Sequence, residues 1–165
     1  MDSITAQENL LGKDDLQKPG RLIQLISFTV GNDTFGVDIL MVHEVIRSAK
    51  FTSVPNSSDF IEGIINLRGN IFPVIDLRKK LHLYSGETPR ENTWIIILEV
   101  QEIMTGFIVD KVLKALKVDP SAIEREPDIA DDRLHKRYIS GIGNIDGERI
   151  TLLDFNQILL GIQCP

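Results

Sequence analysis

Two stretches of the chain repeat each other: GIINLRGNIFPVIDL at residues 63–77 and GIGNIDGERITLLDF at residues 141–155. Aligned without gaps, they share Gly, Ile and Asn, then a second Gly, then an apolar run that ends in Asp and a large apolar residue. A second pair, GVDILMVHEVI at 36–46 and GFIVDKVLKAL at 106–116, occurs in the same order. Two copies at this long spacing predict a duplicated unit that forms two related subdomains, since a solenoid needs many short repeats.

Each copy reads as short strands separated by turn residues. In the first copy, strands over 61–67 and 71–75 flank Arg68-Gly69. In the second, YISGIGNI and ERITLL flank Asp146-Gly147, a dipeptide typical of type I′ hairpin turns. A further hairpin is predicted from WIIILEV and TGFIV around Gln101-Glu102. Many short strands with little helix favour small β-barrels or sandwiches, and the duplication predicts two of them side by side.

Aspartates precede the few stretches that favour helix. Asp76 and Asp154 stand where N-caps would, before LRKKLHL and FNQILL. Asp38 can cap a short helix in which apolar residues recur every three to four positions, although a strand over 41–47 is an alternative. The apolar residues of that stretch are Ile39, Val42, Val45 and Ile46.

Composition indicates a globular protein and excludes several classes. The chain has 165 residues, of which 42% are hydrophobic and 25% charged, so it can bury a substantial core. No apolar run approaches the ~20 residues that cross a bilayer, and the first residues lack the features of a secretion signal, so we expect a cytoplasmic protein. The net charge of −6, with interspersed lysines and arginines, argues against nucleic-acid binding. The single Cys164 rules out an internal disulfide.

The sequence contains no recognisable catalytic motif. His43, His82 and His135 are scattered, without the spacing of metal ligands, and no glycine-rich phosphate loop occurs. Asp76 and Asp154 are related by the repeat, but capping explains both carboxylates better than acid–base chemistry. We therefore expect a protein that is not an enzyme and that binds no cofactor or metal.

The sharpest difference between the copies is Arg68 in place of Asp146. Asp-Gly suits a turn with positive φ, whereas Arg has no local advantage there. A guanidinium at a hairpin tip can bind a carboxylate or an aromatic ring of another molecule. The alternatives are a solvated turn residue or an Arg that bonds the neighbouring copy.

The apolar stripe that includes Val42 and Ile46 also has two interpretations. Such a stripe is ordinarily core, but a short element beside two filled barrels can present part of it outward, as an apolar cleft for a partner helix. Glu44 and His43 would then form a polar rim. Trp94 suits either a core anchor or a groove residue.

Several segments resemble the CheW-like domain of bacterial chemotaxis across residues 22–161. The most specific is IEGIINLRGNIFPVIDLR, accompanied in order by FTVGNDTFGVDI, VHEVI, GFIVDKV and YISGIGNIDGERITLLDFNQIL. The resemblance implies a mainly β fold of two SH3-like five-stranded β-barrels packed side by side with a few short helices. It implies a non-enzymatic adaptor that binds the cytoplasmic tip of methyl-accepting chemoreceptors between the barrels. The regulatory domain of a CheA-type histidine kinase would bind a barrel end.

The resemblance also implies which residues meet partners: Val42, Glu44, Gly63, Arg68 and Thr93. Ile46 joins this set through the apolar stripe. The remaining alternatives are an adaptor of a chemosensory pathway that drives pili or another output, and a small-ligand-binding β-barrel. No direct membrane insertion is expected, and the adaptor would be recruited to membrane-associated receptor arrays.

The expected organisation is a flexible tail over residues 1–20 and a CheW-like domain over 21–165. Within it we expect one subdomain at roughly 36–90 and a second at roughly 91–160. The first strand and the last helix are candidates for exchange between the two.

Overall fold

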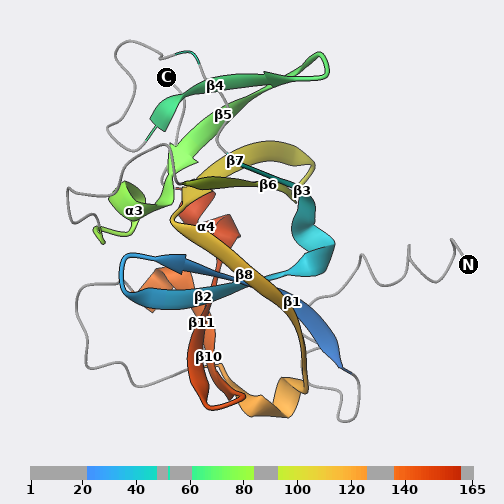
Figure 1. Cartoon of the computed structure of the whole chain (residues 1–165), viewed down its shortest axis with the longest axis vertical. Coiled ribbons are helices and arrows are strands. Elements are labelled where there is room, and N and C mark those ends of the chain that lie inside the picture. The colour runs from blue at the N-terminus through green and yellow to red at the C-terminus, as the bar shows by residue number, and fades with distance from the viewer. Residues whose placement is uncertain (1–21, 48–51, 53–60, 84–92, 126–135, 161–165) are drawn as a thin grey trace, which may run out of the picture.

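The computed structural model describes residues 22–47, 52, 61–83, 93–125 and 136–160 (Figure 1). The expected tail at residues 1–20 lies outside this part of the chain. Within the described ranges, no helix is long and apolar enough to cross a membrane.

The described strands form two sheets, one above the other in Figure 1. The five-stranded sheet has the order β3 (Val42–Arg47), β6 (Trp94–Val100), β7 (Ile103–Val109), β5 (Asn70–Asp76), β4 (Ile61–Leu67). The six-stranded sheet has the order β8 (Lys111–Val118), β1 (Ile23–Val30), β2 (Asp33–Asp38), β11 (Glu148–Leu153), β10 (Ile139–Ile145), β9 (Ile123–Glu124). The short helices are η1 (Ile39–Met41), α3 (Leu77–Lys80), η3 (Pro120–Ala122), η4 (Lys136–Tyr138) and α4 (Phe155–Leu160).

The mainly β fold with two SH3-like sheets is confirmed, and the duplication is visible in the strand pairing. In one sheet β5 runs parallel to β7, with Val74 opposite Gly106, and in the other β11 runs parallel to β2, with Leu152 opposite Gly36. A Cβ at Gly36 would lie 3.0 Å from a Leu152 methyl, and one at Gly106 would lie 3.1 Å from an Ile95 methyl. Each Gly therefore leaves room for a close side chain, from the parallel partner at Gly36 and from the antiparallel neighbour β6 at Gly106.

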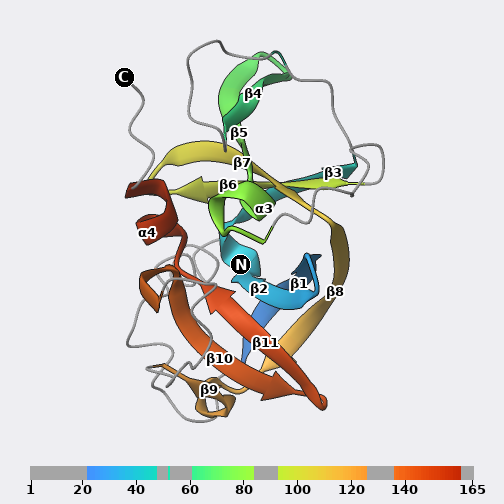
Figure 2. The same ribbon diagram turned by 90° about the vertical axis from the view of Figure 1, so that its left-hand side faces the viewer.

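The two copies exchange strands. β3 follows β2 in the chain but pairs with β6, and β8 follows β7 but pairs with β1. As a result, the described strands from β3 to β7 form the five-stranded sheet, while β1, β2 and the strands from β8 to β11 form the six-stranded sheet. The sheets therefore do not divide near residue 90, because β6 and β7 pair with strands of the first copy. Figure 2 shows β8 running from one sheet into the other.

Each sheet is open between its end strands, since no pairing joins β3 to β4 or β8 to β9 in the described residues. The barrels are therefore SH3-like in strand order without being closed by hydrogen bonds. The six-stranded sheet has one strand more than expected because the two-residue β9 pairs with β10.

Buried apolar side chains form three clusters. One lies inside each curved sheet, and the largest, the inter-sheet core, joins the two sheets and α4. Strand β6 contributes to two of them: Ile96 and Leu98 face the inter-sheet core, whereas Ile95 and Ile97 face the interior of the five-stranded sheet. Because successive residues of a strand point to opposite faces, this position explains why WIIILEV is apolar without interruption.

The predicted caps are confirmed, but one predicted helix is a single turn. Asp76 accepts a hydrogen bond from the Arg78 N–H at 2.9 Å, and Asp154 accepts one from the Gln157 N–H at 3.2 Å. Asp38 accepts from the Leu40 N–H at 2.9 Å, yet only Ile39–Met41 are helical. Residues 42–47 form β3, so the strand alternative is correct there.

Candidate functional site

All six predicted contact residues belong to the five-stranded sheet or its connections. They lie on β3, on β4, in the turn between β4 and β5, and immediately before β6. The residues are Val42, Glu44, Ile46, Gly63, Arg68 and Thr93.

Strand β3 divides its residues between two faces. A bulge at His43 sets the register, because Val42 pairs with Leu98 while Glu44 pairs with Ile97. Val42 packs against the inter-sheet core, whereas Ile46 packs against the core inside the five-stranded sheet. The structure therefore places Val42 and Ile46 on different faces, and they do not form one stripe.

The same sheet brings Glu44 and Arg68 together. Arg68 Nη1 donates to Glu44 Oε1 at 2.8 Å and Nη2 donates to Oε2 at 3.3 Å, a two-point contact between a guanidinium and a carboxylate. The Arg68 side chain is 70% exposed and that of Glu44 25% exposed. The hydrogen bond from Arg68 lowers the pKa of Glu44, and the hydrogen bond to Glu44 raises the pKa of Arg68. The pair keeps both groups charged at neutral pH.

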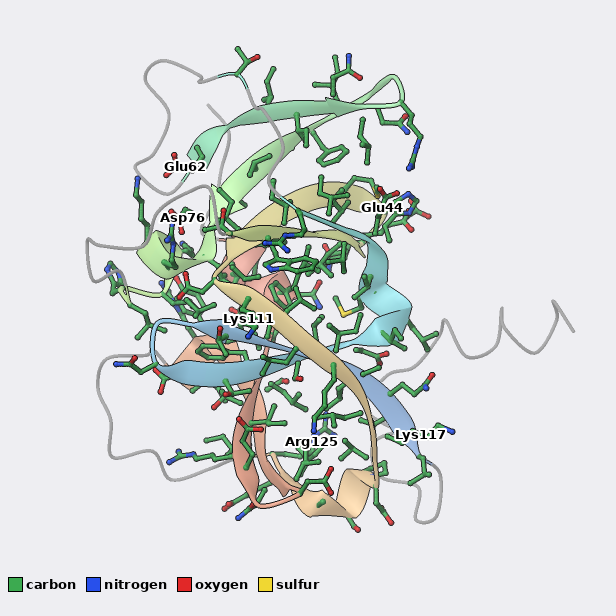
Figure 3. All side chains as sticks on the ribbon, in the orientation of Figure 1. Glu44, Glu62, Asp76, Lys111, Lys117 and Arg125 are labelled. Atoms are coloured by element: carbon green, nitrogen blue, oxygen red, sulfur yellow. The ribbon has the colours of Figure 1, made fainter. Side chains whose placement is uncertain are left out.

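This ion pair connects the two ends of the sheet. Glu44 lies on β3 and Arg68 in the β4–β5 turn, and β3 and β4 are the end strands in the pairing order. In Figure 3, Glu44 lies at the side of the molecule where that turn projects, and Glu62 at the opposite side. Arg68 is thus neither a merely solvated turn residue nor bonded to the second copy. The contact of Arg68 with Glu44 bridges the open side of the sheet. We call the exposed surface formed by Glu44 and Arg68 the barrel-end surface.

The backbone at Arg68 has the strain that the copy comparison predicts. Its φ is 53° and that of Gly69 is 88°, nearly the values of Asp146 and Gly147 at 54° and 80°. The Gly69 N–H donates to Asn66 Oδ1 at 3.0 Å, which supports the turn. Positive φ is less favourable for Arg than for Gly, although Gln101 and Glu102 adopt it in their own turn as well.

Gly63 and Thr93 are buried and offer no side chain to the surface. Gly63 lies on β4 opposite Val74, beside a register shift that bends the strand. Thr93 is 4% exposed and directly precedes Trp94. Their contact with partners stays a prediction, and it would act through the shape of the backbone.

Trp94 has features of both a core anchor and a surface residue, because it packs against the inter-sheet core and is only half-buried. Other half-buried side chains on this edge pack against the same core: Met41, Val42 and Val45. We call these four residues the β3 seam. These four side chains are partly exposed beside the inter-sheet core, and the predicted cleft for a partner helix stays a prediction.

Sequence reasoning missed two arrangements of charge. The buried Arg78 binds Asp76 at 3.1 Å and Asp110 at 3.5 Å, and Arg47 stacks on Trp94. The signal for Arg78 was its place two residues after Asp76, which ends the apolar run over residues 71–75. The signal for Arg47 was its place opposite Trp94, which appears only when 42–47 is taken as a strand.

The described residues contain no group of three or more His, Cys, Asp or Glu side chains that could hold a metal ion. His43 and His82 are exposed, and His135 lies outside the described residues. What the site offers is a half-buried apolar seam and an exposed charged surface on one sheet, an arrangement suited to contacts with macromolecules.

Comparison with known proteins confirms the family resemblance. The profile described as CheW-like domain matches residues 24–163. Chemotaxis protein CheW of Klebsiella aerogenes is 35% identical over 136 residues, which cover 82% of this chain and 81% of that protein. The corresponding protein of Thermotoga maritima is 32% identical over 136 residues, with 82% and 87% covered. The crystal structure of the scaffolding protein TtCheW from Thermoanaerobacter tengcongensis has a TM-score of 0.75 and 33% sequence identity, covering 81% of this chain and 90% of that one.

Proposed function

Because this chain belongs to the CheW-like domain family of chemotaxis adaptors, we propose that it couples chemoreceptors to a CheA-type histidine kinase without catalysing a reaction itself. The observation that carries this proposal is the pair of unlike surfaces on one sheet, an apolar seam and a charged barrel end. The adaptor works in the cytoplasm, where it joins membrane-associated receptor arrays.

The β3 seam is the surface for the receptor tip. Receptor tips in this system are helical hairpins, and an amphipathic helix binds by placing its apolar face along half-buried side chains. Met41, Val42 and Val45 provide such a row beside Trp94. The seam lies where the two sheets meet, so a helix bound there contacts both.

The barrel-end surface is the site for the kinase regulatory domain. Glu44 and Arg68 lie at the open side of the five-stranded sheet, and both are held by their mutual contact. A preformed pair of this kind offers donors and acceptors without loss of side-chain freedom on binding.

The exchange of strands explains how one adaptor can link the two partners mechanically. The chain crosses between the sheets from β2 to β3 and from β7 to β8, and the two sheets cannot separate without exposing the inter-sheet core. Receptor and kinase domain are therefore held on one body, and a reorientation of one partner must move the other. A small-ligand carrier is less consistent with the structure, since Ile, Leu and Val side chains fill the interior of both sheets.

The test is reconstitution of the purified protein with a CheA-type kinase and receptor fragments, followed by measurement of kinase autophosphorylation. We expect receptor control of the kinase only when the adaptor is present. Arg68→Ala should weaken kinase binding about tenfold or more, as expected for an interfacial hot spot. Asp146→Ala is the matched control, because that residue has the same turn geometry in the other sheet. Equal binding by the wild type and both variants, with unchanged kinase control, would refute the assignment of Arg68.

A further inference from the structure

Arg47 and Trp94 form a stacked pair at the end of the β3 seam. Arg47 is the last residue of β3 and pairs with Trp94, the first residue of β6. The guanidinium carbon lies 4.7 Å from the centroid of the Trp94 ring. Arg47 is exposed while Trp94 is half-buried, so the indole holds the guanidinium at the surface.

Apart from the contact with Trp94, the guanidinium of Arg47 has no charged partner in the described residues. Within the described part of the chain, no carboxylate forms an ion pair or hydrogen bond with it, in contrast to Arg68 and Arg78, which both bind carboxylates. Lys111 is also exposed and has no ion pair in the described residues. It lies two positions after Val109, the β7 residue that pairs with Trp94. In a chain of net charge −6, the seam thus ends in an exposed guanidinium that no carboxylate of the described residues pairs with.

Arg47 lies on the same face of the strand as the seam. Val45 and Arg47 are two residues apart and pair with Ile96 and Trp94, which are also two apart. Residues at this spacing point to one side of a sheet. The apolar row therefore ends in a cation that an aromatic ring holds in place.

We propose that the Arg47–Trp94 pair selects partner helices that carry a carboxylate beside their apolar stripe, and that it binds that carboxylate when the stripe lies along the seam. The proposal rests on the proposed function and adds the chemistry that the receptor helix must have. Arg suits this role because its planar donors bind a carboxylate at two points, and stacking fixes the plane. Trp and Arg are also the residues most enriched among interface hot spots.

The experiment measures binding of the full chain to a soluble two-helix fragment of a chemoreceptor tip by titration calorimetry at two ionic strengths. Arg47→Glu should weaken binding about tenfold or more, and Arg47→Lys by less, because Lys keeps the charge but lacks the planar fork. Trp94→Leu should also weaken binding, because it removes the stacking surface. Replacement of the Glu and Asp residues beside the fragment's apolar stripe by Lys should restore binding to Arg47→Glu.

Lys117→Glu is the matched control. It makes the same change in charge at an exposed lysine without an ion pair in the described residues. Figure 3 shows Lys111 and Lys117 at opposite ends of β8. The control therefore changes a charge at the end of β8 that lies farther from the seam. We expect the affinity of Lys117→Glu to stay within about twofold of the wild type, since surface charges this far apart are largely screened.

The outcomes separate the two proposals. If the fragment binds the wild type and Arg47→Glu equally, with the same salt dependence, the role of Arg47 is refuted while the adaptor function stands. If the fragment does not bind the wild type at all, both fail. Thermal unfolding of each variant provides the folding control, and Arg47→Gln supplies a second test should charge reversal disturb the fold.

Discussion

Replacement of Arg78 by Met tests whether a buried charged network holds the two sheets together. The Arg78 side chain is 3% exposed, and its Nε and Nη2 each donate to the Asp76 carboxylate at 3.1 Å. Its Nη1 lies 3.5 Å from Asp110 Oδ1, and the other oxygen of Asp110 accepts a hydrogen bond from the Gly31 N–H at 2.6 Å. The network thus extends from β5 and α3 in one sheet to the β1–β2 turn in the other.

The expected cost of Arg78→Met follows from the burial of the group that it leaves behind. Asp76 is 2% exposed in its side chain and would be left with only the backbone N–H of residue 78 as donor. Removal of one member of a buried ion pair costs about 3 to 5 kcal/mol, against a total stability of about 5 to 15 kcal/mol for a domain. At about 2 to 4 °C per kcal/mol for a chain of this size, the midpoint of thermal unfolding should fall by about 6 to 20 °C.

Urea unfolding followed by the fluorescence of Trp94, the single tryptophan, measures this cost, since that residue packs against the inter-sheet core. Lys117→Met is the control: the same replacement at an exposed site should change the free energy of unfolding by less than about 0.5 kcal/mol. Asp110→Ala should in addition speed amide hydrogen exchange at Gly31, whose N–H loses its acceptor. A loss of less than about 1 kcal/mol for Arg78→Met would show that the network does not stabilise the fold as argued.

Three further predictions concern single groups. Burial raises the pKa of Asp38, so its charged form destabilises the fold at neutral pH. Asp38→Asn should therefore raise the free energy of unfolding at pH 7. This difference from the wild type should disappear below about pH 3.9, where the carboxyl is protonated in both the folded and the unfolded state. The hydrogen bond from Arg68 lowers the pKa of Glu44. The contribution of this bond to stability is therefore present above pH 4.5 and is lost as the pH falls through the lowered pKa. In Arg68→Ala, carboxyl NMR titration should show the Glu44 pKa returning toward 4.5. A Cβ at Gly141 would lie 2.6 Å from an Ile123 methyl, so Gly141→Ala should cost about 1 to 3 kcal/mol in urea unfolding, partly recovered when Ile123 is also changed to Ala.

The hairpins could be predicted because local chemistry determines them. Arg68-Gly69 and Asp146-Gly147 both form turns with positive φ, as the second Gly of each repeat indicates. The Gln101-Glu102 turn was also placed correctly, although neither residue is Gly and both have positive φ. In that case the apolar strands on either side identified the hairpin.

The stretch 39–46 was ambiguous for a physical reason. The bulge at His43 adds one residue to β3, so Val42 and Val45, three positions apart, pack against the same core. Apolar residues three positions apart share a face in a helix but not in a regular strand. The bulge therefore produces a sequence pattern that is typical of a helix. Only the pairing with β6 resolves it.

Sheet membership and the charged contacts depend on long-range pairing, which periodicity does not report. Nothing in the sequence of β8 shows that it pairs with β1 and leaves the sheet of β7. The contact of Glu44 with Arg68 likewise requires that the ends of one sheet curve toward each other. The sequence therefore named candidate residues individually, and their contact with partners stays a prediction, whereas their positions in the sheet required the structure.

Strand β3 connects the two proposed docking surfaces directly. One face carries Val42 and Val45 to the inter-sheet core, and the other carries Ile46 into the five-stranded sheet and Glu44 to Arg68. A strand this short is about 20 Å long at 3.3 Å per residue, and its backbone bonds to β6 along that length. A helix that moves the seam must therefore move Glu44 as well, because the two faces share one backbone. In the proposed function, coupling between receptor and kinase therefore needs no route through the core, since both proposed surfaces include residues of this one bulged strand.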